Sequence, residues 1–324
     1  MDRRTLLAGL AAGTALGAGS ARAMAAHEDL SWHDAARGRD LPLRVRWPDG
    51  AAPCALVVHS HGLGGSREGG DAFGQAWRDA GLAVLHVQHP VSDADTARGG
   101  MAALRGAASA SQLIARVADM RFVLDELLRR SREPGTPWAR VRPDAIGASG
   151  HSFGAQTVLA LAGKSYPRRG PVLAEPRYAA FLALSPAPGR GDARSPGAPP
   201  LAELRRPLLL LTGSLDGDPL GQSFGPEDRA HVYDSLPAGR DLRALLWLDG
   251  ADHMTFGGNA ARRMPARGRA SRDARAVALE DIHQALISRI TTHWWRGRLQ
   301  GDADARVALQ PPSGLGPADR WQAD

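Results

Sequence analysis

The stretch SGHSFGAQ, residues 149–156, places Ser152 between two glycines, Gly150 and Gly154. An apolar segment at 145–148 comes directly before it and predicts a strand that runs into the motif. A serine on a tight strand-to-helix turn is held in strained backbone geometry, and the residues two positions away on each side must be small because they crowd that turn. The motif alone is a weak signal in a chain with 38 glycines. The rest of the chain must therefore supply the partners of a nucleophilic serine.

Apolar runs alternate with helical patterns along the chain, in which 43% of the 324 residues are hydrophobic. Continuous apolar runs are typical of strands that are covered on both faces, and strand–helix alternation makes a sheet mostly parallel. We therefore expect an α/β fold of three layers, with a mostly parallel central sheet and helices on both faces. Strands are expected at 41–46, 55–59, 82–87, 145–148, 181–184, 208–211 and 244–248, and helices at 109–130, 153–162 and 275–295.

The length of the chain allows one large α/β domain or two smaller ones. Because no repeat and no linker interrupts the alternation, we expect a single domain over residues 26–300 and a C-terminal tail over 301–324. Two stretches rich in Pro and Gly, at 186–200 and 310–324, are predicted to be loops.

The first 25 residues have the pattern of a targeting segment. Arg3-Arg4 is followed by an apolar stretch and by Ala21-Arg22-Ala23, which fits a cleavage site. The arginine pair resembles a twin-arginine export signal. A membrane anchor is the alternative, but the apolar stretch is short and rich in Gly and Ala. We expect export to the periplasm or the medium, with no stable membrane insertion after the signal is cleaved.

Charge and cysteine content narrow the possible partners. The formal net charge is +6, and the basic residues, nearly all arginine, are scattered among acidic ones without interleaved aromatics. This pattern argues against nucleic-acid binding. Cys54 is the single cysteine, so neither an intramolecular disulfide nor a cysteine metal cluster can form. It opens an apolar run and is predicted to be a buried, inert thiol.

Chemistry-bearing residues follow the other predicted strands at their carboxyl ends, where an open parallel sheet gathers its site. The Gly-rich segment 60–66 follows one strand, Asp216 follows another, and His253 follows a third. Ser152, Asp216 and His253 therefore occur in the chain order serine, acid, histidine. A phosphate loop is the alternative for 60–66, but the segment lacks a G-K-[ST] ending and a dinucleotide fingerprint.

These motifs together resemble the α/β-hydrolase family over residues 40 to 300. GHSFG is similar to that family's nucleophile elbow. The loop sequences are similar to those of dienelactone-hydrolase-like esterases, platelet-activating-factor acetylhydrolases and related polyester hydrolases. The segments that carry this likeness are the oxyanion loop HSHGLGGS (59–66), the acid loop LLLTGSLD (209–216), the histidine loop DGADHMTF (249–256) and the C-terminal helix TTHWWRGRLQGDADAR (291–306).

The resemblance implies a role for each site residue. Ser152 would attack an acyl carbonyl, and His253 would take its proton and return it to the leaving alcohol. Asp216 would hold the histidine tautomer and stabilise the imidazolium. The backbone N–H groups of Leu63 and Phe153 would bind the oxyanion. For Leu63 the resemblance supplies the position, since the residues themselves indicate only a Gly-flanked loop.

The acid has alternatives nearby. Asp218 lies two residues after Asp216, and the loop motif favours Asp216 over it. Asp249 and Asp252 lie too near His253 in sequence to orient it easily from a separate strand.

A metal site is the alternative reading of four histidines. In that reading His59 and His61 share a strand face, and His86 and His89 add to them. The last two, however, fall on opposite faces of a strand, and no carboxylate motif accompanies them. We therefore expect no metal and no cofactor. His61 is predicted to brace the oxyanion loop by hydrogen bonding, and the side chain of His151 to point away from that of the serine. Asp119 is expected on a solvated or inter-element helix face.

The sequence therefore predicts a serine carboxylic ester hydrolase that acts on small-molecule esters of short to medium acyl length through an acyl-enzyme. Lipid or phospholipid acyl hydrolysis is less favoured because the insert between the strands at 181–184 and 208–211 is short and not apolar. Polyester hydrolysis is less favoured because Ser185-Pro186-Ala187-Pro188 stands where polyester hydrolases tend to have an aromatic residue. Peptidase activity has no added motif. A non-catalytic binding protein on the same scaffold is the alternative of another class.

Overall fold

The computed structural model describes residues 27–166, 173–188, 201–202, 204–219, 224–239, 241–258 and 271–324. The predicted export signal and residues 189–200 of the predicted loop 186–200 lie outside this part of the chain.

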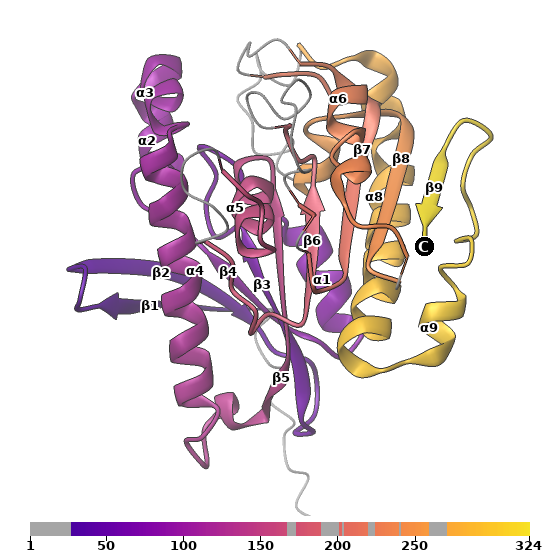
Figure 1. Ribbon diagram of the computed structural model, residues 1–324. Coiled ribbons are helices and arrows are strands. Elements are labelled where there is room, and N and C mark those ends of the chain that lie inside the picture. The colour runs from indigo at the N-terminus through magenta and orange to yellow at the C-terminus, as the bar shows by residue number, and fades with distance from the viewer. Residues whose placement is uncertain are drawn as a thin grey trace, which may run out of the picture.

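The described chain builds a nine-stranded sheet in the order β1-β2-β4-β3-β5-β6-β7-β8-β9 (Figure 1). The six central strands, β4, β3, β5, β6, β7 and β8 in sheet order, run parallel to one another. The strands β1, β2 and β9 pair antiparallel with their neighbours. The strands are β1 Glu28–Asp34, β2 Arg39–Arg46, β3 Cys54–Ser60, β4 Ala83–Val87, β5 Val141–His151, β6 Ala180–Leu184, β7 Leu208–Leu215, β8 Arg243–Asp252 and β9 Arg320–Ala323.

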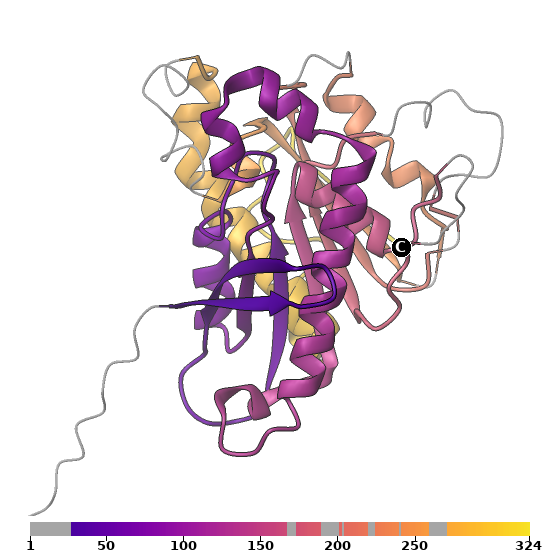
Figure 2. The same ribbon diagram turned by 90° about the vertical axis from the view of Figure 1, so that its left-hand side faces the viewer.

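Helices cover both faces of this sheet because successive side chains of each buried strand point to opposite sides. On β3, Leu56 and Val58 pack under α4 (Ala110–Arg130) and α5 (Phe153–Leu161), while Ala55 and Val57 pack under α1 (Asp71–Asp79) and α8 (Ala274–Trp295). Figure 2 shows α4 and α8 on opposite sides of the sheet. The expected three-layer fold is therefore confirmed.

The shorter helices lie in the connections. They are α2 Ala94–Arg98, α3 Gly100–Ala107, α6 Pro226–Ala230 and α9 Ala303–Val307, with 3-10 turns η1 Pro137–Arg140, η2 Tyr233–Ser235 and η3 Thr255–Gly257, and the π-helical turn η5 Arg296–Gln300 after α8.

The two edges of the sheet differ from the expectation. The edge strands β1 and β9 were not predicted, because most of their residues are exposed or half-buried and an edge strand needs no continuous apolar run. The segment 301–324, expected as a tail, contributes α9 and β9, and β9 pairs with β8 from Ala244 to Trp247.

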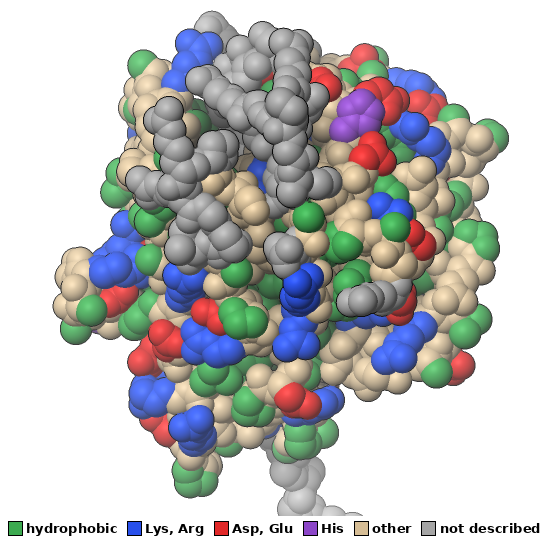
Figure 3. Space-filling model, in the orientation of Figure 1, with side chains coloured by type: hydrophobic (Ala, Val, Ile, Leu, Met, Phe, Trp, Pro, Cys, Tyr) green, Lys and Arg blue, Asp and Glu red, His purple; other side chains and the backbone are tan. Residues whose placement is uncertain are grey.

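Three surface and core features bear on the predictions. Cys54 is buried, as predicted, and burial raises the pKa of its thiol. On the face shown in Figure 3, basic side chains lie among acidic ones. Among the described helices, none combines the length and the apolarity needed to cross a bilayer.

Candidate active site

Ser152 sits at the sharp turn between β5 and α5. Its φ of 55° lies in the left-handed region, which is strained for a residue other than glycine. A Cβ at Gly150 would overlap the backbone of Gly154, and a Cβ at Gly154 would overlap the carbonyl of Ser60. Close backbone packing therefore requires both flanking glycines. This is the reason for small residues on each side of the serine that the sequence analysis gave.

A hydrogen-bonded chain links the three residues that the sequence singled out. His253 Nε2 lies 2.9 Å from Ser152 Oγ, and His253 Nδ1 lies 2.9 Å from Asp216 Oδ1. Asp216 comes directly after β7 and His253 directly after β8, so all three stand at the carboxyl ends of parallel strands. The structure brings together Ser152, His253 and Asp216 in the geometry in which a histidine can take a proton from a serine.

The carboxylate of Asp216 is fully buried and multiply bonded. Besides His253, it accepts hydrogen bonds from Ser185 Oγ at 2.9 Å and Thr212 Oγ1 at 2.9 Å. Burial raises the pKa of Asp216, but the hydrogen bond from His253 and the positive charge of Arg229 outweigh burial and bring the pKa below its usual value. The carboxylate is therefore charged where an imidazolium would form.

Arg229 on α6 is a site residue that sequence reasoning missed. Its buried guanidinium donates to the backbone oxygens of Asp216 at 2.9 Å, Gly217 at 2.7 Å and Ser185 at 3.1 Å. Its Nε also lies 3.1 Å from the Asp216 carboxylate. No local pattern marks Arg229, because α6 has only five residues, too few for a helical periodicity to show which side chains are buried. Ser185 has a φ of 54°, and no sequence pattern indicated its bond to Asp216, since Ser185 entered the prediction only as part of the segment 185–188 after a strand.

The other aspartates near His253 have different partners. Asp249 accepts from Ser214 Oγ at 2.8 Å and pairs with Arg275. Asp252 pairs with Arg272 at 2.8 Å. The carboxylate that contacts His253 Nδ1 comes from the end of the neighbouring strand β7, and it belongs to Asp216 rather than Asp218.

The Gly-rich loop after β3 lies beside the serine. A Cβ at Gly62 would be 3.4 Å from the Cβ of Ser152, so the backbone that leads into Leu63 passes next to the nucleophile. Gly64 N donates to Ser92 O at 2.9 Å, which joins this loop to the segment after β4. Phe153 begins α5 immediately after Ser152. The two proposed oxyanion donors therefore belong to segments that meet at Ser152.

Three of the four histidines that a metal site would need bond protein atoms through Nδ1. His59 Nδ1 bonds Ser149 Oγ at 2.7 Å, His86 Nδ1 bonds Gly69 O at 2.9 Å, and His89 Nδ1 bonds Asp119 at 2.9 Å. Within the described residues, no three metal-ligating side chains gather.

The side chain of His151 lies against the histidine loop, with its ring centre 4.9 Å from that of His253. Its Nε2 donates to the backbone oxygen of His253 at 3.0 Å. Burial lowers the pKa of His151 to about 3, with the neighbouring His253 as the next cause. His151 therefore supports the histidine loop as a neutral side chain.

Comparison with known proteins supports the fold. No protein-family model matches the sequence, and no curated protein is significantly similar to it. The strand order, the helices on both faces and the site at the strand ends make this an α/β-hydrolase fold. One solved structure that is similar is a ferulic acid esterase from Streptomyces cinnamoneus, with 20% sequence identity, a TM-score of 0.59, and coverage of 91% of this chain and 95% of that one.

Proposed function

We propose that this protein is a serine carboxylic ester hydrolase that uses Ser152 as nucleophile, His253 as general acid and base, and Asp216 as the acid of the triad. The single observation that carries the proposal is the unbroken chain Ser152 Oγ–His253 Nε2 and His253 Nδ1–Asp216 Oδ1, with both distances 2.9 Å. The likeness to a ferulic acid esterase agrees with it through the fold.

The reaction would proceed in two halves. Ser152 Oγ attacks the acyl carbon while His253 Nε2 takes the hydroxyl proton, and the carbonyl oxygen becomes an oxyanion held by the N–H groups of Leu63 and Phe153. Collapse of this intermediate breaks the ester C–O bond, and His253 gives its proton to the departing alcohol. Water, deprotonated by His253, then attacks the acyl carbon of the acyl-enzyme. The bond from this carbon to Ser152 Oγ breaks, His253 returns the proton to Oγ, and the carboxylic acid leaves.

The substrates that we favour are small esters of short to medium acyl length. The insert between β6 and β7 is short and rich in Gly, Pro and Arg, which does not suit a long apolar lid. The aromatic acid named for the similar structure adds feruloyl esters to the series that should be tested.

The test is hydrolysis of p-nitrophenyl esters of rising acyl length, and of methyl ferulate, by wild type and Ser152→Ala. We expect the variant to lose about 10⁴-fold or more in kcat, because the nucleophile is gone and only binding and the oxyanion donors remain. Ser131→Ala is the matched control, since its Oγ bonds Leu128 O at the end of α4. A fluorophosphonate should label wild type and not Ser152→Ala. Equal ester hydrolysis by both proteins would contradict the assignment of the nucleophile.

A further inference from the structure

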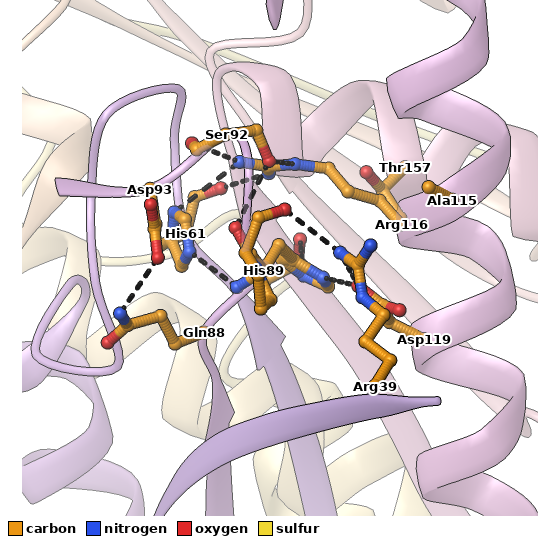
Figure 4. Close-up of polar contacts among 12 residues, drawn as sticks. Arg39, His61, Gln88, His89, Ser92, Asp93, Ala115, Arg116, Asp119 and Thr157 are labelled. Carbon is orange, nitrogen blue, oxygen red and sulfur yellow. Dashed lines mark hydrogen bonds and ion pairs between the residues drawn. The ribbon is translucent and has the colours of Figure 1, made fainter. Parts of the chain in front are cut away.

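A buried arginine from α4 lies behind the loop that carries Leu63. Arg116 is fully buried, and its guanidinium donates to His61 O at 2.6 Å, Ser92 Oγ at 2.9 Å and Ser92 O at 3.0 Å (Figure 4). Burial lowers the pKa of Arg116 to about 9, while the charges of Asp119 and Asp93 oppose this effect. Burying a charge is costly, so the fold holds this guanidinium against a free-energy penalty.

The contacts of Arg116 fall on the backbone that presents the first oxyanion donor. The carbonyl of Gly62 and the N–H of Leu63 belong to one peptide unit, and in a trans peptide they point in opposite directions. His61 Nδ1 bonds Gly62 O at 2.6 Å, and Arg116 Nη2 approaches the same oxygen at 3.5 Å. Fixing this carbonyl on the α4 side fixes the direction of the Leu63 N–H and polarises it as a donor.

The tautomer of His61 is set by a second contact. The backbone N–H of His89 donates to His61 Nε2 at 3.0 Å, so this nitrogen accepts and the proton resides on Nδ1. That tautomer is the one that can donate to Gly62 O. Burial and then the charge of Arg116 hold the pKa of His61 well below its usual value, which keeps the ring neutral.

Arg116 also reaches the segment that carries the second donor. Its guanidinium lies over the Phe153 ring, 4.6 Å from the ring centre. Ser92 O, which accepts from Arg116, also accepts from Gly64 N at 2.9 Å in the Gly-rich loop. One side chain therefore contacts the loop around Leu63, the segment after β4 and the residue that follows Ser152.

The helix that carries Arg116 is itself anchored to this region. Asp119 is fully buried rather than solvated and accepts from His89 Nδ1 at 2.9 Å, Arg37 Nη1 at 2.7 Å and Arg39 Nη2 at 3.0 Å. His89 in turn bonds Ser60 Oγ at 2.9 Å through Nε2. Figure 4 shows Arg39, His89 and Asp119 beside the contacts of Arg116. This network restricts movement of the helix relative to the loop that Arg116 holds.

We propose that Arg116 is a positioning residue for the oxyanion hole. From α4 it holds the backbone of residues 61–63 in place through the carbonyls of His61 and Gly62, and it packs on the ring of Phe153. This inference rests on the proposed function, because it gives Arg116 a role in stabilising the transition state of ester hydrolysis. It predicts that loss of Arg116 lowers kcat and leaves KM nearly unchanged, since the donors it aligns act on charge that develops in the transition state.

The experiment compares Arg116→Met, Arg116→Lys and Ser92→Ala with wild type on a p-nitrophenyl ester. Misplacing one oxyanion donor should reduce kcat by about 10- to 100-fold in Arg116→Met. Arg116→Lys should recover part of the loss, because an ammonium is charged but lacks the planar fork that reaches several carbonyls. Ser92→Ala should give a smaller decrease. Arg121→Met on the same helix is the control, since Arg121 donates to Ala174 O, which lies outside the network of Figure 4.

A second readout separates positioning from a merely structural role. An alkyl boronic acid forms a tetrahedral adduct with the serine and should bind Arg116→Met more weakly than wild type by a factor similar to the loss in kcat. A folded Arg116→Met with wild-type kcat and boronate affinity, or with a raised KM alone, would overturn the inference. If Arg116→Met does not fold, unchanged kcat in both Arg116→Lys and Ser92→Ala would overturn it.

Different results would refute the proposed ester hydrolysis and the positioning role of Arg116. A folded wild-type protein that hydrolyses no ester and takes no fluorophosphonate label at Ser152 would refute the esterase and, with it, the role of Arg116. Labelled and active wild type with an unaffected Arg116→Met refutes the positioning role alone.

Discussion

Acid is expected to unfold this protein through histidines that the fold buries in their neutral form. Burial lowers the pKa of His86 and of His89 to about 4 and that of His151 to about 3, and it lowers those of His59 and His61 as well. In the unfolded chain these imidazoles return to their usual pKa near 6.5. Below that pH the unfolded state binds more protons than the folded state, so stability falls as pH falls.

His89 gives the magnitude for one group. Burial is the largest cause of its lowered pKa, the charge of Arg116 adds to it, and the contact with Asp119 opposes it without prevailing. A pKa of about 4 in the fold against about 6.5 in the unfolded chain means that roughly 3 kcal/mol of stability is lost between these two pH values. Two such histidines would remove an amount comparable to the entire stability of many domains, which is about 5–15 kcal/mol.

The assay is urea unfolding at pH 8.5, 7.5, 6.5, 5.5 and 4.5, followed by the fluorescence of the tryptophans. We expect the free energy of unfolding to be nearly constant above pH 7 and to decline between pH 6.5 and 4.5 by more than one histidine can account for. His89→Gln should flatten the decline, because one proton-binding group is removed from the unfolded chain. A free energy that stays constant or rises between pH 6.5 and 4.5 would show that the reasoning about neutral buried histidines is wrong.

Two further predictions concern the candidate site. Asp216→Asn should reduce kcat by about 10⁴-fold, because the amide cannot stabilise an imidazolium as a carboxylate does, whereas Asp218→Asn should cost far less; steady-state ester hydrolysis checks this, and equal losses would contradict the choice of Asp216. Gly154→Ala should destabilise the fold by about 3 kcal/mol or more, because the new Cβ meets the carbonyl of Ser60, while Gly106→Ala, with open space around it, should be neutral or stabilising. Urea denaturation of both variants measures the difference, and a fully stable Gly154→Ala would refute the packing argument.

The interior strands could be predicted from the sequence because their environment leaves a local trace. A strand covered on both faces must be apolar along most of its length, as in the segments 55–58 and 208–211. The long helix at 109–130 shows an apolar residue at every third or fourth position because one of its faces packs on the sheet. The three residues of the proposed triad were also predictable, since the turn at Ser152 requires small neighbours and the other two residues follow predicted parallel strands at their carboxyl ends.

The edge strands of the sheet and two buried arginines, Arg116 and Arg229, could not be predicted from a local sequence pattern. β9 is exposed enough that its four residues need no apolar pattern, and its pairing with β8 joins segments far apart in the chain. Arg116 and Arg229 lie on helices, and arginine is common on the exposed faces of helices in general. Their burial depends on carbonyls supplied by distant loops, which only the folded chain brings together.

The placement of these two arginines follows from how irregular loops satisfy their backbone. Loops at the carboxyl ends of strands carry carbonyl groups that have no partner in a helix or sheet, and buried carbonyls require one. Arginine offers five donors in a rigid plane and can bind several carbonyls at once. Arg116 does this for the loop around Leu63, and Arg229 does it for the loop around Asp216. Each side of the candidate site is therefore fixed by one buried guanidinium, and the serine between them is fixed by its own strained turn.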